Sequence, residues 1–157
     1  MIAVDARLKT AELIVSSPYT RALQTAAIIS RETGLKICIA VDLHEWEPDK
    51  TNQYTTSEES FMLAREFNLY KGKYPEGQQM RWETLDEVRK RVRRVADKYA
   101  NYGKVIFGGY GMAFRTLTYI EQMKPAEIVE CIYDIGQEDC VYSVSYTHLR
   151  AHETRSN

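Results

Sequence analysis

The sequence predicts an α/β protein with a three-layer architecture, in which a mostly parallel sheet is flanked by helices. Two short apolar runs, at 13–16 and 37–41, enclose a segment of helical length, and such strand–helix–strand units with short links are typical of parallel strand pairs. A third apolar run at 104–107 precedes a glycine-rich turn and a further helical segment. The length of 157 residues fits one domain.

The first unit begins with Leu-Ile-Val-Ser at 13–16, which predicts a buried strand. We expect the next helix to start with Ser17 as its N-cap and Pro18 in its first position, and to end at Gly34. The run at 37–41 is β-branched at three of its five positions, which favours a second strand.

Two capping boxes mark the starts of two later helices. Thr56 with Glu59 predicts a helix that continues through Leu69, and Thr84 with Glu87 predicts a second helix. A loop at 71–81, with two glycines and a proline, separates them. The second helix has one apolar face and is expected to end at Gly103; the residues of that face are Leu85, Val88, Val92, Val95, Ala96 and Tyr99.

The last part of the chain is expected to complete the sheet. The strand at 104–107 leads through the turn at 108–111 into a helix at 112–122. Two further segments, 130–135 and 139–143, predict a closing hairpin. We interpret 1–143 as the domain and 144–157 as a non-native tail, because the tail has no pattern of its own; its His148 and His152 are therefore not considered as site residues.

Composition excludes several classes of protein. The chain has 21 basic and 22 acidic residues, which argues against a nucleic-acid partner. It has no apolar run of about 18 residues and no signal peptide, so we expect no membrane partner. Its three cysteines, Cys38, Cys131 and Cys140, form no Cys-x-x-Cys pair, which predicts a cytoplasmic protein without a metal site.

An arginine stands where a helix is expected to begin. Arg21 lies in the first turn, where a cation gains nothing from the helix dipole. Its position is explained if the guanidinium and the free N–H groups of the helix start face an anion, most simply a phosphate. The alternative is a surface arginine on an ordinary helix.

The Gly108-Gly109-Tyr110-Gly111 turn offers a second place for a phosphate. Phe114 breaks the dinucleotide-binding Gly-x-Gly-x-x-Gly pattern, and no Walker sequence follows. The alternative is a simple tight turn at the carboxyl edge of the sheet, which is also the edge where α/β proteins bind ligands.

Two other groups of side chains allow two interpretations each. The basic cluster Lys90, Arg91, Arg93 and Arg94 is expected to be a solvated helix face, with a nucleic-acid or polyphosphate contact as the alternative. The aromatic residues Trp46, Tyr54 and Trp82 could line a substrate lid or pack under a loop.

The motifs together resemble a known family. Ser-Ser-Pro-Tyr-Thr-Arg-Ala-Leu-Gln-Thr-Ala at 16–26 closely resembles the second motif of the histidine phosphatase superfamily, the phosphoglycerate-mutase-like proteins. The resemblance continues at Leu43-His44-Glu45, where family phosphatases carry an acid, and at 105–115, where the family has a strand followed by Ser-His-Gly. It covers about 6–143.

The resemblance implies hydrolysis of small phosphomonoesters through a phosphohistidine, without metal or other cofactor. It implies that Glu45 is the proton donor, although Glu47 is also near, and that Tyr110 occupies the position of the second catalytic histidine. The substrate-binding residues that it implies are Arg21, Ser17, Gly109 and Gly111.

The sequence departs from the family at two points. It contains no Arg-His-Gly, so we expect the domain to be incomplete at its N-terminus and to lack the first strand. Tyr110 is neutral at pH 7 and cannot supply an imidazolium charge. We therefore expect an impaired phosphatase. The alternatives are a non-catalytic module that binds a phosphorylated ligand or a partner, a phosphoglycerate-mutase-type phosphotransferase, and a fragment without function. The oligomeric state stays open.

Overall fold

The computed structural model describes residues 5–51, 53, 55–118, 120 and 123–136 of the chain. Within these residues, three parallel strands form the sheet in the order β2-β1-β3, with β1 at Leu13–Ser16, β2 at Ile37–Ile39 and β3 at Val105–Gly108. In this register Val15 of β1 lies opposite Cys38 of β2 and Phe107 of β3. β1 is therefore paired on both of its edges.

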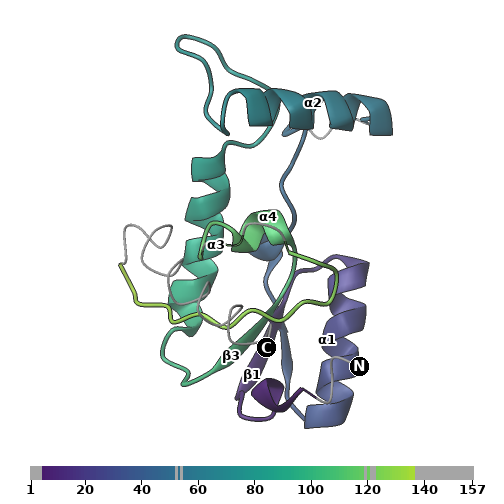
Figure 1. The fold of residues 1–157 in the computed structure, drawn as a ribbon, viewed down its shortest axis with the longest axis vertical. Helices are drawn as coiled ribbons and strands as arrows, with labels where there is room; N and C mark the ends of the chain where they lie inside the picture. Colours follow the sequence, from purple (N-terminus) through teal and green to yellow (C-terminus); the bar gives the residue numbers. More distant parts are fainter. Residues whose placement is uncertain (1–4, 52, 54, 119, 121–122, 137–157) are drawn as a thin grey trace, which may run out of the picture.

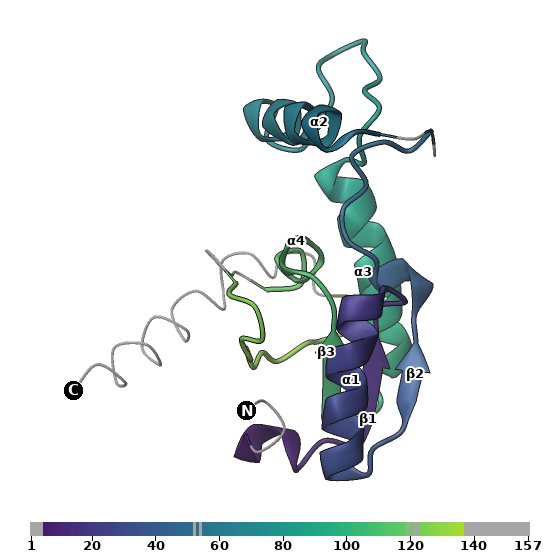
Figure 2. The same cartoon turned by 90° about the vertical axis from the view of Figure 1, so that its right-hand side faces the viewer.

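The two faces of β1 pack against different helices. Leu13 and Val15 belong to one apolar cluster with the buried residues of α3 (Leu85–Tyr99), whereas Ile14 packs with α1 (Thr20–Thr33) on the other face. Figure 1 shows the sheet between α3 and α1, and Figure 2 shows the same arrangement from the side. The predicted three-layer α/β architecture is confirmed.

Helix α1 begins later than predicted. Its N-cap residue is Tyr19 rather than Ser17, and Pro18 lies before the helix. The reason is that the Ser17 N–H donates to the Gly108 carbonyl at 2.7 Å, which keeps Ser17 in the sheet edge. The predicted end at Gly34 is confirmed, because Gly34 has a left-handed φ of 74° and its N–H donates to Ser30.

Strand β2 is shorter than the predicted run at 37–41. The chain leaves the sheet after Ile39 and forms a single 3-10 turn, η3, at Val41–Leu43. Val41 is exposed, while Leu43 is fully buried in the core on the α3 side. The turn therefore carries the chain over the carboxyl edge of the sheet toward the 44–47 segment.

Both predicted capping boxes are present. Thr56 and Glu59 cap α2 (Ser57–Leu69), and Thr84 and Glu87 cap α3. Helix α3 ends at Tyr99 rather than at Gly103, because a tighter turn follows in which the Tyr102 N–H donates to the Tyr99 carbonyl at 3.1 Å. The Gly103 N–H instead donates a hydrogen bond to the Glu12 carboxylate at 2.8 Å.

Helix α2 lies away from the sheet, at the far end of α3 (Figures 1 and 2). An aromatic cluster joins it to the body: Phe67 of α2 lies 5.0 Å from Trp46 and 5.4 Å from Trp82 between ring centroids, and Tyr74 lies 5.0 Å from Trp82. Of the two interpretations, Trp46 and Trp82 fit aromatic packing under a loop. Tyr54 lies outside the described residues.

The last described segments differ from the predicted ones. Helix α4 is one turn at Gly111–Phe114 instead of a helix over 112–122, of which 119, 121 and 122 are not described. The predicted strand at 130–135 is wrong, because this segment pairs with no strand in the described part of the chain. Its Tyr133 hydroxyl instead donates to Asp97 of α3 at 2.6 Å. The other half of the predicted hairpin, 139–143, lies outside the described residues.

Gly72, between α2 and α3, provides a test of the packing there. Its φ is +70°, and an added Cβ would lie 2.7 Å from Cβ of Leu85 and 2.9 Å from Cζ of Phe67. We expect Gly72→Ala to lower the free energy of unfolding in urea by about 2–5 kcal/mol, from backbone strain and overpacking together. Gly77→Ala is the control, because Gly77 has a similar φ of +73° but open space around it. It should cost only about 1–2 kcal/mol, and equal losses would contradict the overpacking at Gly72.

Candidate functional site

The three motifs singled out in the sequence meet at the carboxyl edge of the sheet. Ser16 and Ser17 end β1, and the Ala40 N–H after β2 donates to the Ser16 carbonyl at 2.9 Å. On the other side, a Cβ added to Gly109 after β3 would lie 3.5 Å from the Leu43 carbonyl oxygen. The structure thus brings the 16–21, 43–45 and 108–111 segments together.

The smallest predicted site residues form the floor of this edge. Ser17 is fully buried, and its Oγ accepts a long hydrogen bond of 3.4 Å from the Tyr19 N–H. Gly109 leaves room for the Phe114 ring, whose Cζ would lie 2.9 Å from an added Cβ. Gly111 begins α4, and an added Cβ there would lie 3.4 Å from Cβ of Met123. These three residues therefore shape the turn closely around its neighbours.

Arg21 extends from the first turn of α1 toward the glycine-rich turn. Its guanidinium carbon lies 5.5 Å from the centroid of the Tyr110 ring, within the range of a cation–π contact. The Tyr110 ring meets Tyr19 edge-on at 5.6 Å, and Tyr19 lies 6.4 Å from the His44 ring. Arg21 itself is exposed, so an anion can reach its N–H groups.

Glu45 lies half-buried beside this cation. One carboxylate oxygen accepts the Trp46 N–H at 2.9 Å. Burial raises the pKa of Glu45 above its ordinary value, although that hydrogen bond and the charges of Arg91 and Arg21 act in the opposite direction. A carboxyl with a raised pKa holds its proton closer to neutral pH, as a proton donor must.

His44 and Glu47 are placed differently. Nδ1 of His44 lies 2.7 Å from the Glu45 carbonyl oxygen, to which it donates, and 3.8 Å from a carboxylate oxygen of Glu47. The Glu47 N–H donates to the Glu83 carboxylate at 3.3 Å. The Glu47 carboxylate thus lies toward His44.

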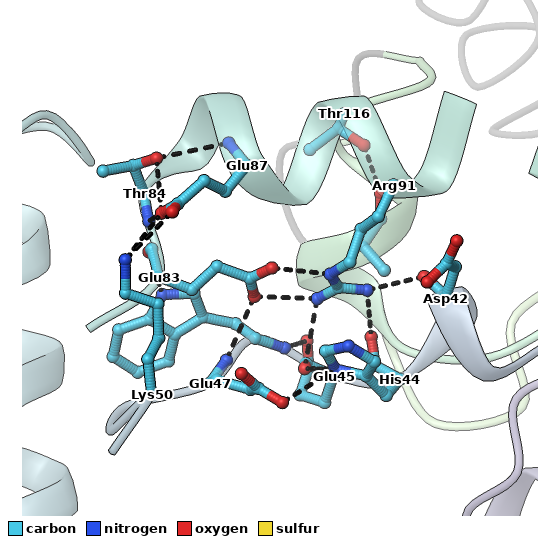
Figure 3. A network of polar contacts seen from close by, with 12 residues as sticks. Asp42, His44, Glu45, Glu47, Lys50, Glu83, Thr84, Glu87, Arg91 and Thr116 are labelled. Atoms are coloured by element: carbon cyan, nitrogen blue, oxygen red, sulfur yellow. Dashed lines mark hydrogen bonds and ion pairs between the residues drawn. The ribbon is translucent and has the colours of Figure 1, made fainter. Parts of the chain in front are cut away.

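Arg91 corrects the interpretation of the basic cluster as a solvated face. Lys90 and Arg94 are exposed, but Arg91 is only 5% exposed, and its guanidinium pairs with both carboxylate oxygens of Glu83 at 2.6 and 2.9 Å (Figure 3). The signal was present in the sequence, because Arg91 follows Val88 by three positions and precedes Val95 by four. Helical spacing therefore places it on the apolar face.

The described residues contain neither a metal-binding cluster nor a membrane-spanning helix. No group of three or more His, Cys, Asp or Glu side chains there could hold a metal ion. None of the helices described is both long enough and apolar enough to cross a bilayer.

Comparison with known proteins identifies the family. The model of the histidine phosphatase superfamily (branch 1) matches residues 3–153. The chain belongs to this superfamily. The comparison with curated protein sequences produced no match.

Solved structures show the same fold. The chain is similar to a mycobacterial glucosyl-3-phosphoglycerate phosphatase, with a TM-score of 0.55 at 20% identity over 74% of this chain and 57% of that one. It is also similar to Bacillus stearothermophilus YhfR, with a TM-score of 0.50 at 21% identity over 71% of this chain and 59% of that one. This histidine phosphatase family member therefore spans less than two thirds of the length of these structures.

The raised pKa of Glu45 predicts how stability depends on pH. Because the folded protein holds the Glu45 proton more tightly than the unfolded chain, the free energy of unfolding falls as pH rises from the ordinary carboxyl pKa through the raised one. Glu45→Gln cannot ionise and should lose this fall, so that the variant gains stability relative to the parent near pH 7.

Urea unfolding of both proteins between about pH 4 and pH 7 measures the difference. Glu76→Gln is the control, because it makes the same chemical change at an exposed loop residue away from the site. A parent and a Glu45→Gln variant with parallel pH profiles would contradict the burial of an ionisable Glu45.

Proposed function

We propose that this sheet edge binds the phosphoryl group of a small phosphomonoester, and that the chain is a phosphomonoester hydrolase of the histidine phosphatase type with impaired turnover. The observation that supports it best is the placement of Arg21, whose guanidinium lies over the Tyr110 ring and acts electrostatically on Glu45. A cation, a protonatable acid and a glycine-rich turn then share one edge of the sheet.

In this proposal each residue has one role. Arg21 binds phosphoryl oxygens, as arginine does through paired N–H donors, and Ser17, Gly109 and Gly111 shape the floor beneath them. Glu45 gives its proton to the leaving oxygen of the substrate, which the raised pKa of its carboxyl favours. The similarity to a glucosyl-3-phosphoglycerate phosphatase agrees with a small phosphorylated substrate.

We infer impaired turnover because the sequence lacks the motif that carries the nucleophilic histidine of the family. The sequence contains no Arg-His-Gly, and His44 donates to the Glu45 carbonyl in the segment 42–47, here called the acid loop. Loss of the nucleophile in an enzyme that uses covalent catalysis can lower turnover by several orders of magnitude. By resemblance, Tyr110 takes the position of the second histidine, where a phenol does not supply an imidazolium cation.

A non-catalytic binding module is the second candidate, and the surroundings of Tyr110 favour it. Tyr110 contacts both Arg21 and Tyr19, so it is an integrated part of the site rather than an exposed replacement. Such a module would bind a phosphorylated ligand without turnover. For either function, the cysteine content suits the cytoplasm as the proposed location.

Phosphate binding tests the proposed site. We expect Arg21→Ala to weaken the binding of inorganic phosphate by roughly ten- to hundredfold, because one charge-assisted hydrogen bond contributes about 1.5–3 kcal/mol. Isothermal titration calorimetry on the full chain measures the affinity. Arg31→Ala is the matched control, because Arg31 lies at the far end of the same helix and pairs with Glu32 at 3.1 Å. Equal affinities of the two variants would refute an anion site at Arg21.

Turnover tests the impairment. With a generic aryl phosphate we expect the chain to release phosphate at a rate close to the uncatalysed background. A steady metal-free turnover that Arg21→Ala abolishes would show that the chain is an unimpaired enzyme. Turnover that a chelator stops would instead contradict the phosphohistidine chemistry.

A further inference from the structure

One guanidinium holds the loop that carries Glu45. Nη1 of Arg91 donates to the carbonyl oxygens of Asp42 at 2.7 Å and His44 at 2.8 Å, and Nη2 donates to the carbonyl oxygen of Glu45 at 3.2 Å (Figure 3). The three carbonyls belong to one short segment, at the point where the chain crosses the sheet edge. Helix α3 therefore fixes the backbone on both sides of His44.

Glu83 holds Arg91 in place. Its two carboxylate oxygens accept from Nε at 2.6 Å and from Nη2 at 2.9 Å, and both residues are 5% exposed. The backbone of Glu83 contributes as well: its N–H donates to the Glu47 carbonyl at 2.9 Å, and its carbonyl accepts Nε1–H of Trp46 at 2.7 Å. The segment 45–47 is thus tied to residue 83 as well as to Arg91.

Every donor of the Arg91 guanidinium is used. A guanidinium has five N–H groups, and these five meet the two carboxylate oxygens of Glu83 and the three loop carbonyls. Lysine offers three donors from a single nitrogen, so it cannot bridge the same acceptors. The arrangement therefore depends on arginine and not simply on a buried positive charge.

We propose that Arg91 is a positioning residue for the acid loop, and that it holds the Glu45 carboxyl beside Arg21 at the carboxyl edge of the sheet. What the carboxyl then does for a substrate rests on the proposed function, whereas the positioning rests on the contacts of Arg91 alone. The link from backbone to carboxyl is short, because the Glu45 carboxylate accepts the N–H of Trp46, the next residue in the loop, at 2.9 Å.

A merely structural ion pair would behave differently. A pair that only fills the core stabilises the whole fold, and weakening it makes every buried amide open more often. A residue that positions the loop acts locally, because its loss leaves three loop carbonyls without their donor while the strands keep their own bonds. The Trp46 amide reports on this directly, since its acceptor is the Glu45 carboxylate.

The charge around Glu45 comes from several elements. Arg21 and Tyr19 approach from the start of α1, and Arg91 and Glu83 from α3 and the residue before its cap. His44 and Glu47 are neighbours in the loop itself. Substitution of Arg91 by lysine leaves all of these charges in the chain. A change in the pKa of Glu45 in that variant therefore reports a change in the position of its carboxyl relative to them.

Hydrogen exchange of the full chain tests the proposal with Arg91→Lys, which keeps the charge. In this variant we expect the Trp46 amide to exchange at least tenfold faster relative to the Val15 amide of β1. We also expect the pKa of Glu45, measured by carboxyl NMR, to change. Glu83→Gln removes the charged partner of Arg91, and we expect the Trp46 amide to exchange faster than the Val15 amide in this variant as well. The pKa of Glu45 is compared only in Arg91→Lys, because the charge of Glu83 itself raises that pKa. Lys90→Met is the control, because Lys90 is an exposed neighbour in α3 that pairs with Asp86 at 2.8 Å.

The outcomes separate the two proposals. If Trp46 and Val15 accelerate equally in Arg91→Lys and Glu83→Gln and the pKa of Glu45 stays in place in Arg91→Lys, Arg91 is only a core ion pair and the inference fails. If Trp46 alone accelerates but the parent chain binds no inorganic phosphate, the positioning holds and the proposed function fails.

Discussion

The burial of β1 is the constraint on which the rest of the structure depends. All four of its residues are buried, its two edges are paired, and its two faces pack on different helices. A strand that is held on four sides fixes the position of its carboxyl end. The residues that leave this end, Ser17 and then Arg21 on α1, therefore have a position determined by the most rigid part of the fold.

Parts of the architecture could be predicted because the signals were local. The apolar run at 13–16, the left-handed position of Gly34 and the two capping boxes each involve residues a few positions apart. The start of α1 could not be predicted in the same way. Ser17 has the ideal chemistry for a cap, but its N–H bonds to Gly108, some 90 residues later, and this long-range pairing overrides the local preference.

The residues of the candidate site likewise fall into those that the local sequence predicts and those that depend on long-range contacts. Arg21, Glu45 and Tyr110 could be found by motif, and the parallel order of the strands explains why the three meet at one edge. Arg91 was missed because charge was given more weight than helical spacing. Its hydrogen-bond partners come from two separate segments, residues 42–45 and Glu83. No local sequence pattern indicates that these segments meet at one guanidinium.

The aromatic cluster at the root of α2 has an optical consequence. The chain has two tryptophans, and both Trp46 and Trp82 belong to this cluster, where Phe67 lies between them. Trp46 directly follows Glu45 and bonds to the Glu83 carbonyl, whereas Trp82 is fully buried. The tryptophan fluorescence of the protein therefore originates entirely at the junction of α2 with the acid loop, and a movement of that junction is visible without any added dye.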